Sequence, residues 1–373
     1  MLPETYETLE FDKKGACNVC NGHQDKKSKI DWEARAKTFS KLVEDFRGKG
    51  DYDCLVPFSG GKDSTYVLYE IVVKHKLKPL VISFDHGFFR EQHLKNIERT
   101  LKILGTDYLA FRPNMKIVGK LMLESLKRKG DFCWHCHTGI FAYPMQIAVK
   151  FNIPLIIWGE SESEYTGNYD FDEMEEQDEE AFNRFINLGI NAEDMYGFIK
   201  DGVIEERDLA PFKYPKLRDL KKIGYKSLKY GSFINWDPIK QTEIIKKELG
   251  WKMDQVEGLA PEFWMEKIEC RVNGIRDWLK YIKRGFGRTA QSVAREIRLG
   301  KMTKEEGKIL VDKYHAKKPK SLEYFLKIMN ISEEEFMNIA LKHQISPWDY
   351  NETIVTDGEK LKDQDDWDDV PIR

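Results

Sequence analysis

Between residues 51 and 160, short apolar runs alternate with longer stretches in which apolar residues recur at helical spacing. Short runs rich in Val, Ile, Leu and Phe predict buried strands, and the longer stretches predict amphipathic helices. We expect strands at 53–58, 79–84, 108–112 and 153–158, and helices at 64–74, 91–104, 115–129 and 138–151. This alternation favours an α/β fold, a parallel sheet with helices on both faces.

The pattern changes on both sides of this α/β region. Residues 1–50 hold a Cys-x-x-Cys segment and then an amphipathic helix that Asp31 opens. We place the α/β domain at 51–235 and interpret its last part, 161–235, as an irregular insertion.

The insertion contains two charged runs. An acidic run covers 170–180, and a basic, aromatic run extends from Lys213 to Tyr230. Tyrosines among lysines are compatible with RNA stacking, but we interpret both runs as solvated surface.

The remainder of the chain is predicted to contain a helical region followed by an acidic tail. Residues 236–350 are expected to form a helical region, in which Ser332 begins a helix with a capping-box pattern. Residues 351–373 are polar and acidic and are expected to be a mobile tail.

Composition excludes some classes of protein. The 373 residues are 41% hydrophobic and 33% charged, as in soluble globular proteins, and the formal net charge of −3 argues against a general nucleic-acid binder. No apolar run approaches the roughly 20 residues that span a bilayer, and the N-terminus does not read as a signal peptide. We therefore expect a cytoplasmic protein without a membrane partner.

The stretch from Pro57 to Thr65 reads PFSGGKDST and directly follows the first predicted strand. In a strand–glycine–helix turn, backbone N–H groups and the helix N-terminus are available to an anion, and glycines let the backbone approach a phosphate. Ser59 and Ser64 add hydroxyl groups. Asp63 would repel a bare phosphate, so it is expected beside Mg²⁺ or as a helix cap.

The spacing differs from the two commonest nucleotide motifs, the P-loop and the dinucleotide fingerprint. Ser-Gly-Gly-x-Asp-Ser instead resembles the pyrophosphate loop (PP-loop) of the ATP pyrophosphatase superfamily, whose members split ATP into AMP and pyrophosphate. The resemblance implies an adenine nucleotide alpha-hydrolase-like domain with Mg²⁺, and Lys62 and Asp63 as catalytic residues. The ATP-binding residues would be Ser59, Gly60, Gly61, Asp63, Ser64 and Thr65.

Other polar positions fall at the carboxyl ends of predicted strands, where ligands bind in parallel sheets. Phe84 and Asp85 follow the second predicted strand, and Gly159 and Glu160 follow the fourth. We predict that these four residues complete the ATP site.

Six cysteines suggest metal or redox chemistry in a cytosolic protein. Cys54 lies within an apolar run and is expected in the core. Cys17 with Cys20, and Cys133 with Cys136, have metal-chelating spacing. Three alternatives stay open: one zinc site built from both pairs, a zinc knuckle at Cys17 and Cys20 with a 4Fe–4S cluster at Cys133, Cys136 and Cys270, or free thiols.

Several further motifs are spread over about residues 1–315. They are Gly15–Cys20, Ile30–Arg35, Val56–Thr65, Cys133–Gly139, Glu269–Gly274 and Lys283–Arg288. Together these motifs resemble those of the N-acetyl sugar amidotransferases of bacterial surface-polysaccharide (lipopolysaccharide O-antigen) biosynthesis.

The resemblance implies an AMP-forming amidotransferase that converts an acetamido group on a nucleotide-linked sugar into an acetamidino group. Ammonia would come from a glutaminase together with a synthase-like subunit. Arg271 and Arg288 lie in the shared motifs and are candidates for contacting the sugar nucleotide. Members of the family carry a further Cys-x-x-Cys pair ahead of the Pro-Glu-Thr stretch, whereas this sequence starts at Met1.

Two other functions stay open on sequence grounds. A tRNA thiolation enzyme shares the pyrophosphate loop and a three-cysteine cluster, but the near-neutral charge counts against it. A non-catalytic nucleotide-binding scaffold is the second, and the acidic Asp63 within the loop counts against that.

Overall fold

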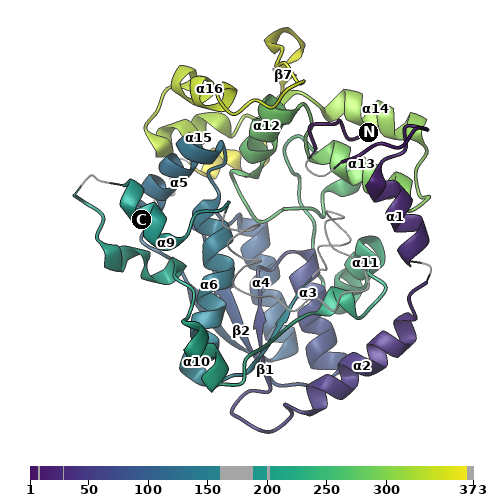
Figure 1. Cartoon of the computed structure of the whole chain (residues 1–373), viewed down its shortest axis with the longest axis vertical. Helices are drawn as coiled ribbons and strands as arrows, with labels where there is room; N and C mark the ends of the chain where they lie inside the picture. The colour runs from purple at the N-terminus through teal and green to yellow at the C-terminus, as the bar shows by residue number, and fades with distance from the viewer. Residues whose placement is uncertain (7–8, 28, 160–187, 200–201, 368–373) are drawn as a thin grey trace. The chain divides into compact units, whose positions relative to one another are not determined.

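The computed structural model describes residues 1–6, 9–27, 29–159, 188–199 and 202–367. The chain divides into two compact units, which we call the sheet unit and the helical unit. The sheet unit comprises Asp31–Leu121 and Cys133–Lys252, and the helical unit comprises Met1–Ile30, Met122–Phe132 and Met253–Arg373. Figure 1 shows the elements of both units.

The sheet unit is built on a five-stranded sheet whose neighbouring strands are all parallel, which confirms the predicted α/β fold. Its order is β3-β2-β1-β4-β5, so the chain moves outward in one direction from β1 and then in the other from β4. The strands are β1 Cys54–Pro57, β2 Pro79–Phe84, β3 Asp107–Phe111, β4 Leu155–Trp158 and β5 Lys226–Lys229.

In the part of the chain that the structure describes, the helices of this unit precede, connect or follow the strands. They are α2 Trp32–Glu44, α3 Lys62–Tyr69, α4 Glu91–Leu104, α5 Met115–Lys129, α6 Trp134–Phe151, α9 Ala192–Phe198, α10 Leu217–Lys222 and α11 Pro238–Leu249. Shorter turns are the π-helix η1 Glu70–Lys74 and the 3₁₀ helices η3 Glu206–Phe212 and η4 Tyr230–Ser232. The boundary between the two units falls within α5.

Alternating strand residues divide between two apolar layers, because successive side chains of a strand point to opposite faces. Leu55 of β1 and Ile156 of β4 pack with Met145 and Ala148 of α6 in one core cluster. Val56, the next residue of β1, is fully buried and points away from that cluster. On that second side α3, α4 and α11 pack together, so helices cover both faces (Figure 1).

The fifth strand was not expected. We interpreted the basic, aromatic run at 213–230 as solvated surface, and this is wrong for its ordered elements. The run contains α10 and β5, and Leu228 and Tyr230 are buried. Only one apolar residue lies in Lys226–Lys229, so the strand depends on pairing with β4 and on burial rather than on a hydrophobic run. The acidic run at 170–180 lies outside the described residues.

The helical unit contains a Cys-rich N-terminal part and a helical C-terminal part. Its elements are α1 Asn18–Lys27, η5 Pro261–Phe263, α12 Asn273–Arg284, α13 Arg288–Arg298, α14 Lys304–Tyr314, β6 Lys317–Lys318, α15 Leu322–Met329, α16 Glu333–Leu341, η6 Glu352–Ile354, β7 Thr356–Asp357 and η7 Gln364–Trp367. Ser332 caps α16 through Glu335 N–H, as predicted.

The acidic tail differs from expectation. Leu361 and Trp367 are buried, so the part of the tail up to Trp367 packs against the helical unit. Burial of these two apolar side chains stabilises the packing of a polar segment that its composition alone predicts to be mobile. In the described part of the chain, none of the helices has the length and apolar character needed to cross a bilayer.

The contact between Gly139 of α6 and Phe84 of β2 gives a test of this packing. A Cβ at Gly139 would lie 2.6 Å from Phe84 Cε2, so Gly139→Ala should lower the free energy of unfolding by ~1–3 kcal/mol despite the better helix propensity of alanine. Denaturant unfolding measures the change.

Gly119→Ala in α5 is the matched control, because a Cβ there meets nothing within 4 Å. It should leave stability unchanged or raise it by up to about 1 kcal/mol. Equal effects of both substitutions would contradict the packing described here.

Candidate active site

The loop between β1 and α3 is formed by Ser59, Gly60 and Gly61. Gly60 has φ +78°, a left-handed conformation that residues with a Cβ adopt at a cost. The site is also crowded, since a Cβ on Gly60 would lie 2.9 Å from His93 Cε1 and 3.0 Å from Ile97 Cδ1 of α4. Glycine is therefore required both by the backbone and by the neighbouring helix.

The hydroxyl of Ser64 organises this loop from the first turn of α3. Its Oγ accepts hydrogen bonds from the backbone N–H groups of Ser59 at 3.2 Å and Gly60 at 3.1 Å. Ser59 Oγ lies 3.1 Å from Ser64 Oγ and accepts from Gly61 N–H at 3.3 Å. Three backbone N–H groups and two hydroxyls thus converge on one small region.

This region lies at the start of α3, whose N-cap is Gly61. Gly61 provides no side-chain hydrogen bond to the first turn, in contrast to the Asp caps of α2 and α11 and the Ser cap of α16. The N-terminal N–H groups of a helix carry partial positive charge and favour an anion. The geometry is therefore compatible with a phosphate-binding turn, which stays a prediction.

Lys62 and Asp63 form an ion pair at this helix start. Lys62 Nζ lies 2.6 Å from Asp63 Oδ2, with side-chain exposures of 4% and 18%. Asp63 therefore balances the positive charge of Lys62 within the loop, and the Asp63 carboxylate is the more solvent-accessible of the two groups. Thr65 is fully buried, and its N–H donates to Gly61 C=O at 3.0 Å.

The loops after β2 and β4 belong to the same edge of the sheet, where parallel strands place ligand sites. Asp85 accepts from Arg112 Nε at 2.7 Å and from Gly87 N–H at 2.8 Å, which fixes its carboxylate. Gly159 follows β4, and its C=O accepts from Gly231 N–H at 3.0 Å. Since strand order reverses between β1 and β4, Gly159 lies across the switch point from the β1–α3 loop.

Two residues predicted at this edge need separate comment. The Phe84 ring is buried in the apolar cluster that includes Trp134 and Phe212, so its side chain serves the core. Glu160 lies outside the described residues.

Sequence reasoning missed three residues around the loop. Trp251 Nε1 donates to Gly60 C=O at 3.2 Å, and His93 and Ile97 border Gly60. The sequence carried no signal for these three residues, because their positions depend on tertiary contacts.

The predicted metal ligands belong to both units. Cys133 and Cys136 lie at the start of α6 in the sheet unit, and Cys270 belongs to the helical unit. Among described residues, no group of three or more His, Cys, Asp or Glu side chains is arranged to hold a metal. The zinc and 4Fe–4S predictions therefore find no support here.

Cys17 and Cys20 are neighbours in the helical unit. Burial raises the pKa of the Cys20 thiol, and its hydrogen bond with Cys17 raises it further. Cys54 is fully buried in β1, as predicted, and burial raises its pKa strongly.

The two arginines predicted to contact substrate have different surroundings, both within the helical unit. Arg288 is bound to Asp277 through Nε at 2.8 Å and Nη2 at 3.1 Å. Burial acts to raise the pKa of Asp277, but Arg288 and Lys280 outweigh it and the pKa is lowered. The positive charge of Arg288 is thus already paired with the carboxylate of Asp277.

Arg271 is different. Its guanidinium carbon lies 5.7 Å from the centre of the Trp367 ring. Its Nε and Nη1 are shielded from solvent and have no hydrogen-bond partner among the described residues. Buried N–H donors of this kind are costly unless an acceptor binds them.

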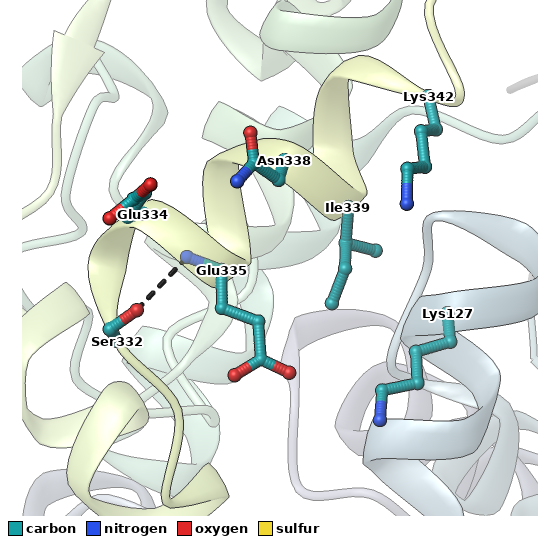
Figure 2. A pocket seen from close by; sticks show the side chains of 7 residues that line it. All are labelled: Lys127, Ser332, Glu334, Glu335, Asn338, Ile339 and Lys342. Carbon is teal, nitrogen blue, oxygen red and sulfur yellow. Dashed lines mark hydrogen bonds between the residues drawn. The ribbon is translucent and has the colours of Figure 1, made fainter.

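A separate pocket of about 500 Å³ lies in the helical unit at α16 and the end of α5. Figure 2 shows the residues that line it, with Lys127 from α5 and Glu335 and Lys342 from the segment of α16. Two lysines and two glutamates among its lining residues do not select one ligand chemistry. None of the predicted site residues lines it.

Comparisons with known proteins found one matching family model and a similar protein. Residues 239–362 match the family model described as LPS biosynthesis protein WbpG-like, C-terminal domain. The chain is also similar to the uncharacterised protein MJ1599 of Methanocaldococcus jannaschii, with 23% identity over 83% of this chain and 90% of the relative.

Among solved structures, the NMN synthetase of Francisella tularensis aligns over 77% of this chain and 94% of its own, with 11% identity and a TM-score of 0.31. That likeness is too weak to carry an argument about function. The α/β architecture and the loop geometry described above stand on the structure itself.

Gly60→Ala tests the phosphate-binding turn. The substitution places a Cβ against α4 in a left-handed backbone, so we expect the affinity for MgATP to fall at least tenfold, equivalent to ~1.4 kcal/mol. Isothermal titration calorimetry measures the affinity for MgATP.

Gly105→Ala is the control. Gly105 also has positive φ, but it ends α4, and a Cβ there would meet no other atom within 4 Å. If both variants bound MgATP like the unmodified protein, the loop would not be the site.

Proposed function

We propose that this protein is an ATP-dependent, AMP-forming amidotransferase that acts on an N-acetyl group of a nucleotide-linked sugar. The observation that carries the proposal is the turn from Ser59 to Ser64, in which a left-handed glycine, two hydroxyls and an uncapped helix start converge. The match of residues 239–362 to a lipopolysaccharide biosynthesis domain supports a sugar substrate.

The proposed chemistry starts from an acetamido group whose oxygen is a poor leaving group. The amide oxygen attacks the α-phosphorus of ATP, the bond to the bridging oxygen breaks, and pyrophosphate leaves. Ammonia then adds to the activated carbon, and AMP departs with the former amide oxygen. After proton loss the product is an acetamidino group, so atoms balance with one ATP and one ammonia consumed.

The described residues have definable tasks in this scheme. Backbone N–H groups of the β1–α3 loop and the hydroxyls of Ser59 and Ser64 would stabilise the charge that grows on departing pyrophosphate. Asp63 is the more exposed member of its ion pair, and we propose that its carboxylate would hold Mg²⁺. When bound, Mg²⁺ supplies charge neutralisation at the phosphates. Asp85 and Gly159 would border the nucleotide.

We also propose that ammonia comes from a glutaminase acting with a synthase-like subunit in the cytoplasm, as the resemblance implies. The proposed scheme assigns no role to the Cys17–Cys20 and Cys133–Cys136 pairs or to Cys270, and it includes neither zinc nor a 4Fe–4S cluster.

Product analysis tests the reaction. We expect ATP to be converted to AMP and pyrophosphate only when a nucleotide-linked diacetamido sugar and ammonium are both present, and chromatography with mass spectrometry would detect AMP and the acetamidino product. Asp63→Asn should lower turnover at least 100-fold, the scale of losing a preorganised electrostatic contact. Asp45→Asn, at an exposed position after α2, is the control.

Two outcomes would contradict the proposal. Turnover triggered by undermodified tRNA instead of the sugar would assign a thiolation activity. ATP binding without turnover under any of these conditions would indicate a nucleotide-binding scaffold.

We further propose that Arg271 binds an anionic group of the sugar nucleotide, supported by its shielded Nε and Nη1. Arg271→Lys keeps the charge but loses the paired N–H donors. We expect KM for the sugar nucleotide to rise about tenfold, with kcat nearly unchanged, because a charge-assisted hydrogen bond contributes ~1.5–3 kcal/mol.

Arg218→Lys is the control for this experiment, since the Arg218 side chain is 76% exposed. An unchanged KM for Arg271→Lys would remove Arg271 from the substrate site. It would leave the ATP-dependent reaction itself unaffected.

A further inference from the structure

The turn that follows α11 reaches the candidate ATP loop. This turn, which we call the α11 turn, consists of Gly250, Trp251 and Lys252. Gly250 has φ +61° and ends the helix, which redirects the chain so that Trp251 points inward. Trp251 is 1% exposed, and its Nε1 donates to Gly60 C=O at 3.2 Å.

Helix α4 holds the α11 turn through its backbone. Asn96 Nδ2 donates to Lys252 C=O at 2.7 Å, and Asn96 Oδ1 accepts from Lys252 N–H at 3.0 Å. Arg99 Nη1 donates to Gly250 C=O at 2.8 Å. Three hydrogen bonds therefore fix the backbone on both sides of Trp251, and Asn96 is itself buried.

The same helix also borders Gly60 directly. His93 and Ile97 of α4 occupy the space that a Cβ on Gly60 would need. Gly60 is thus held at its α-carbon by side chains of α4 and at its carbonyl by Trp251. Both contacts depend on one face of α4, because residues 93, 96 and 97 are neighbours on a helix.

Fixing the Gly60 carbonyl has a consequence for the next N–H group. A trans peptide is planar, and its C=O and N–H point in opposite directions. When Trp251 holds Gly60 C=O, the Gly61 N–H of the same peptide must point the other way, toward Ser59 Oγ at 3.3 Å. That is the side on which the loop hydroxyls gather.

A glycine pair is the place where such a peptide turns over most easily, since Gly60 and Gly61 lack the side chains that restrict φ and ψ. A flipped peptide would present a carbonyl oxygen, and so negative partial charge, to a bound phosphate. We propose that Trp251 is a positioning residue that holds the Gly60–Gly61 peptide in its anion-binding orientation, and that Asn96 and Arg99 position Trp251. This inference rests on the proposed function, because it assumes that the loop binds the phosphates of ATP.

Trp251→Phe separates the hydrogen bond from the packing. Phenylalanine retains most of the apolar volume but has no N–H donor. We expect the dissociation constant for MgATP to rise about tenfold, the scale of one hydrogen bond to a charged group. The affinity for adenosine, which has no phosphate, should change less than twofold. Isothermal titration calorimetry measures both ligands.

Trp134→Phe is the matched control. Trp134 is also fully buried in the sheet unit, and its Nε1 donates to the backbone C=O of Ile190 at 2.8 Å. Both variants should lower the melting temperature by similar amounts, whereas only Trp251→Phe should weaken MgATP binding. Equal losses of MgATP and adenosine affinity in Trp251→Phe would assign Trp251 a general structural role and overturn the inference.

Asn96→Ala gives a second route that leaves the indole in place. It should weaken MgATP binding, and the double variant should be no weaker than Trp251→Phe alone, because both substitutions release the same peptide. Additive losses would contradict the coupling. If the unmodified protein does not bind MgATP, the proposed function fails; if it binds and Trp251→Phe binds equally well, this inference alone fails.

Discussion

The peptide that joins Gly60 to Gly61 sets the geometry on which the candidate site depends. It lies where β1 ends and α3 begins, so its conformation determines how the backbone N–H groups meet the helix start. Left-handed φ at Gly60, the side chains of α4 and the indole of Trp251 together leave this peptide little freedom. A turn so constrained presents donors to an anion without reorganisation when the anion binds.

The rest of the sheet unit supports this turn. The parallel order β3-β2-β1-β4-β5 places the β1–α3 loop beside the switch point, with the loops after β2 and β4 at the same edge. The α11 turn, far along the chain, closes against α4 and reaches back to the loop. The site is therefore assembled from four separate segments on a scaffold whose strands are almost fully buried in the centre of the sheet.

Sequence reasoning located β1 and β2 well because both are short, mainly apolar runs. The loop was predictable because all its functional groups are contiguous from Ser59 to Ser64. β5 was not, since Lys226–Lys229 has no apolar run and forms only by pairing with β4. The roles of Trp251 and Asn96 could not be predicted, because their contacts join residues that are far apart in the sequence. Trp251 and Gly60, for example, are separated by 191 residues.

Amide hydrogen–deuterium exchange of the full chain, followed by mass spectrometry with and without MgATP, tests the central claim most directly. If phosphates bind at the β1–α3 loop, the peptide that contains Gly60, Gly61 and Ser64 should exchange more slowly when nucleotide is bound. Nucleotide binding that left exchange in this peptide unchanged, and slowed it elsewhere, would contradict the account.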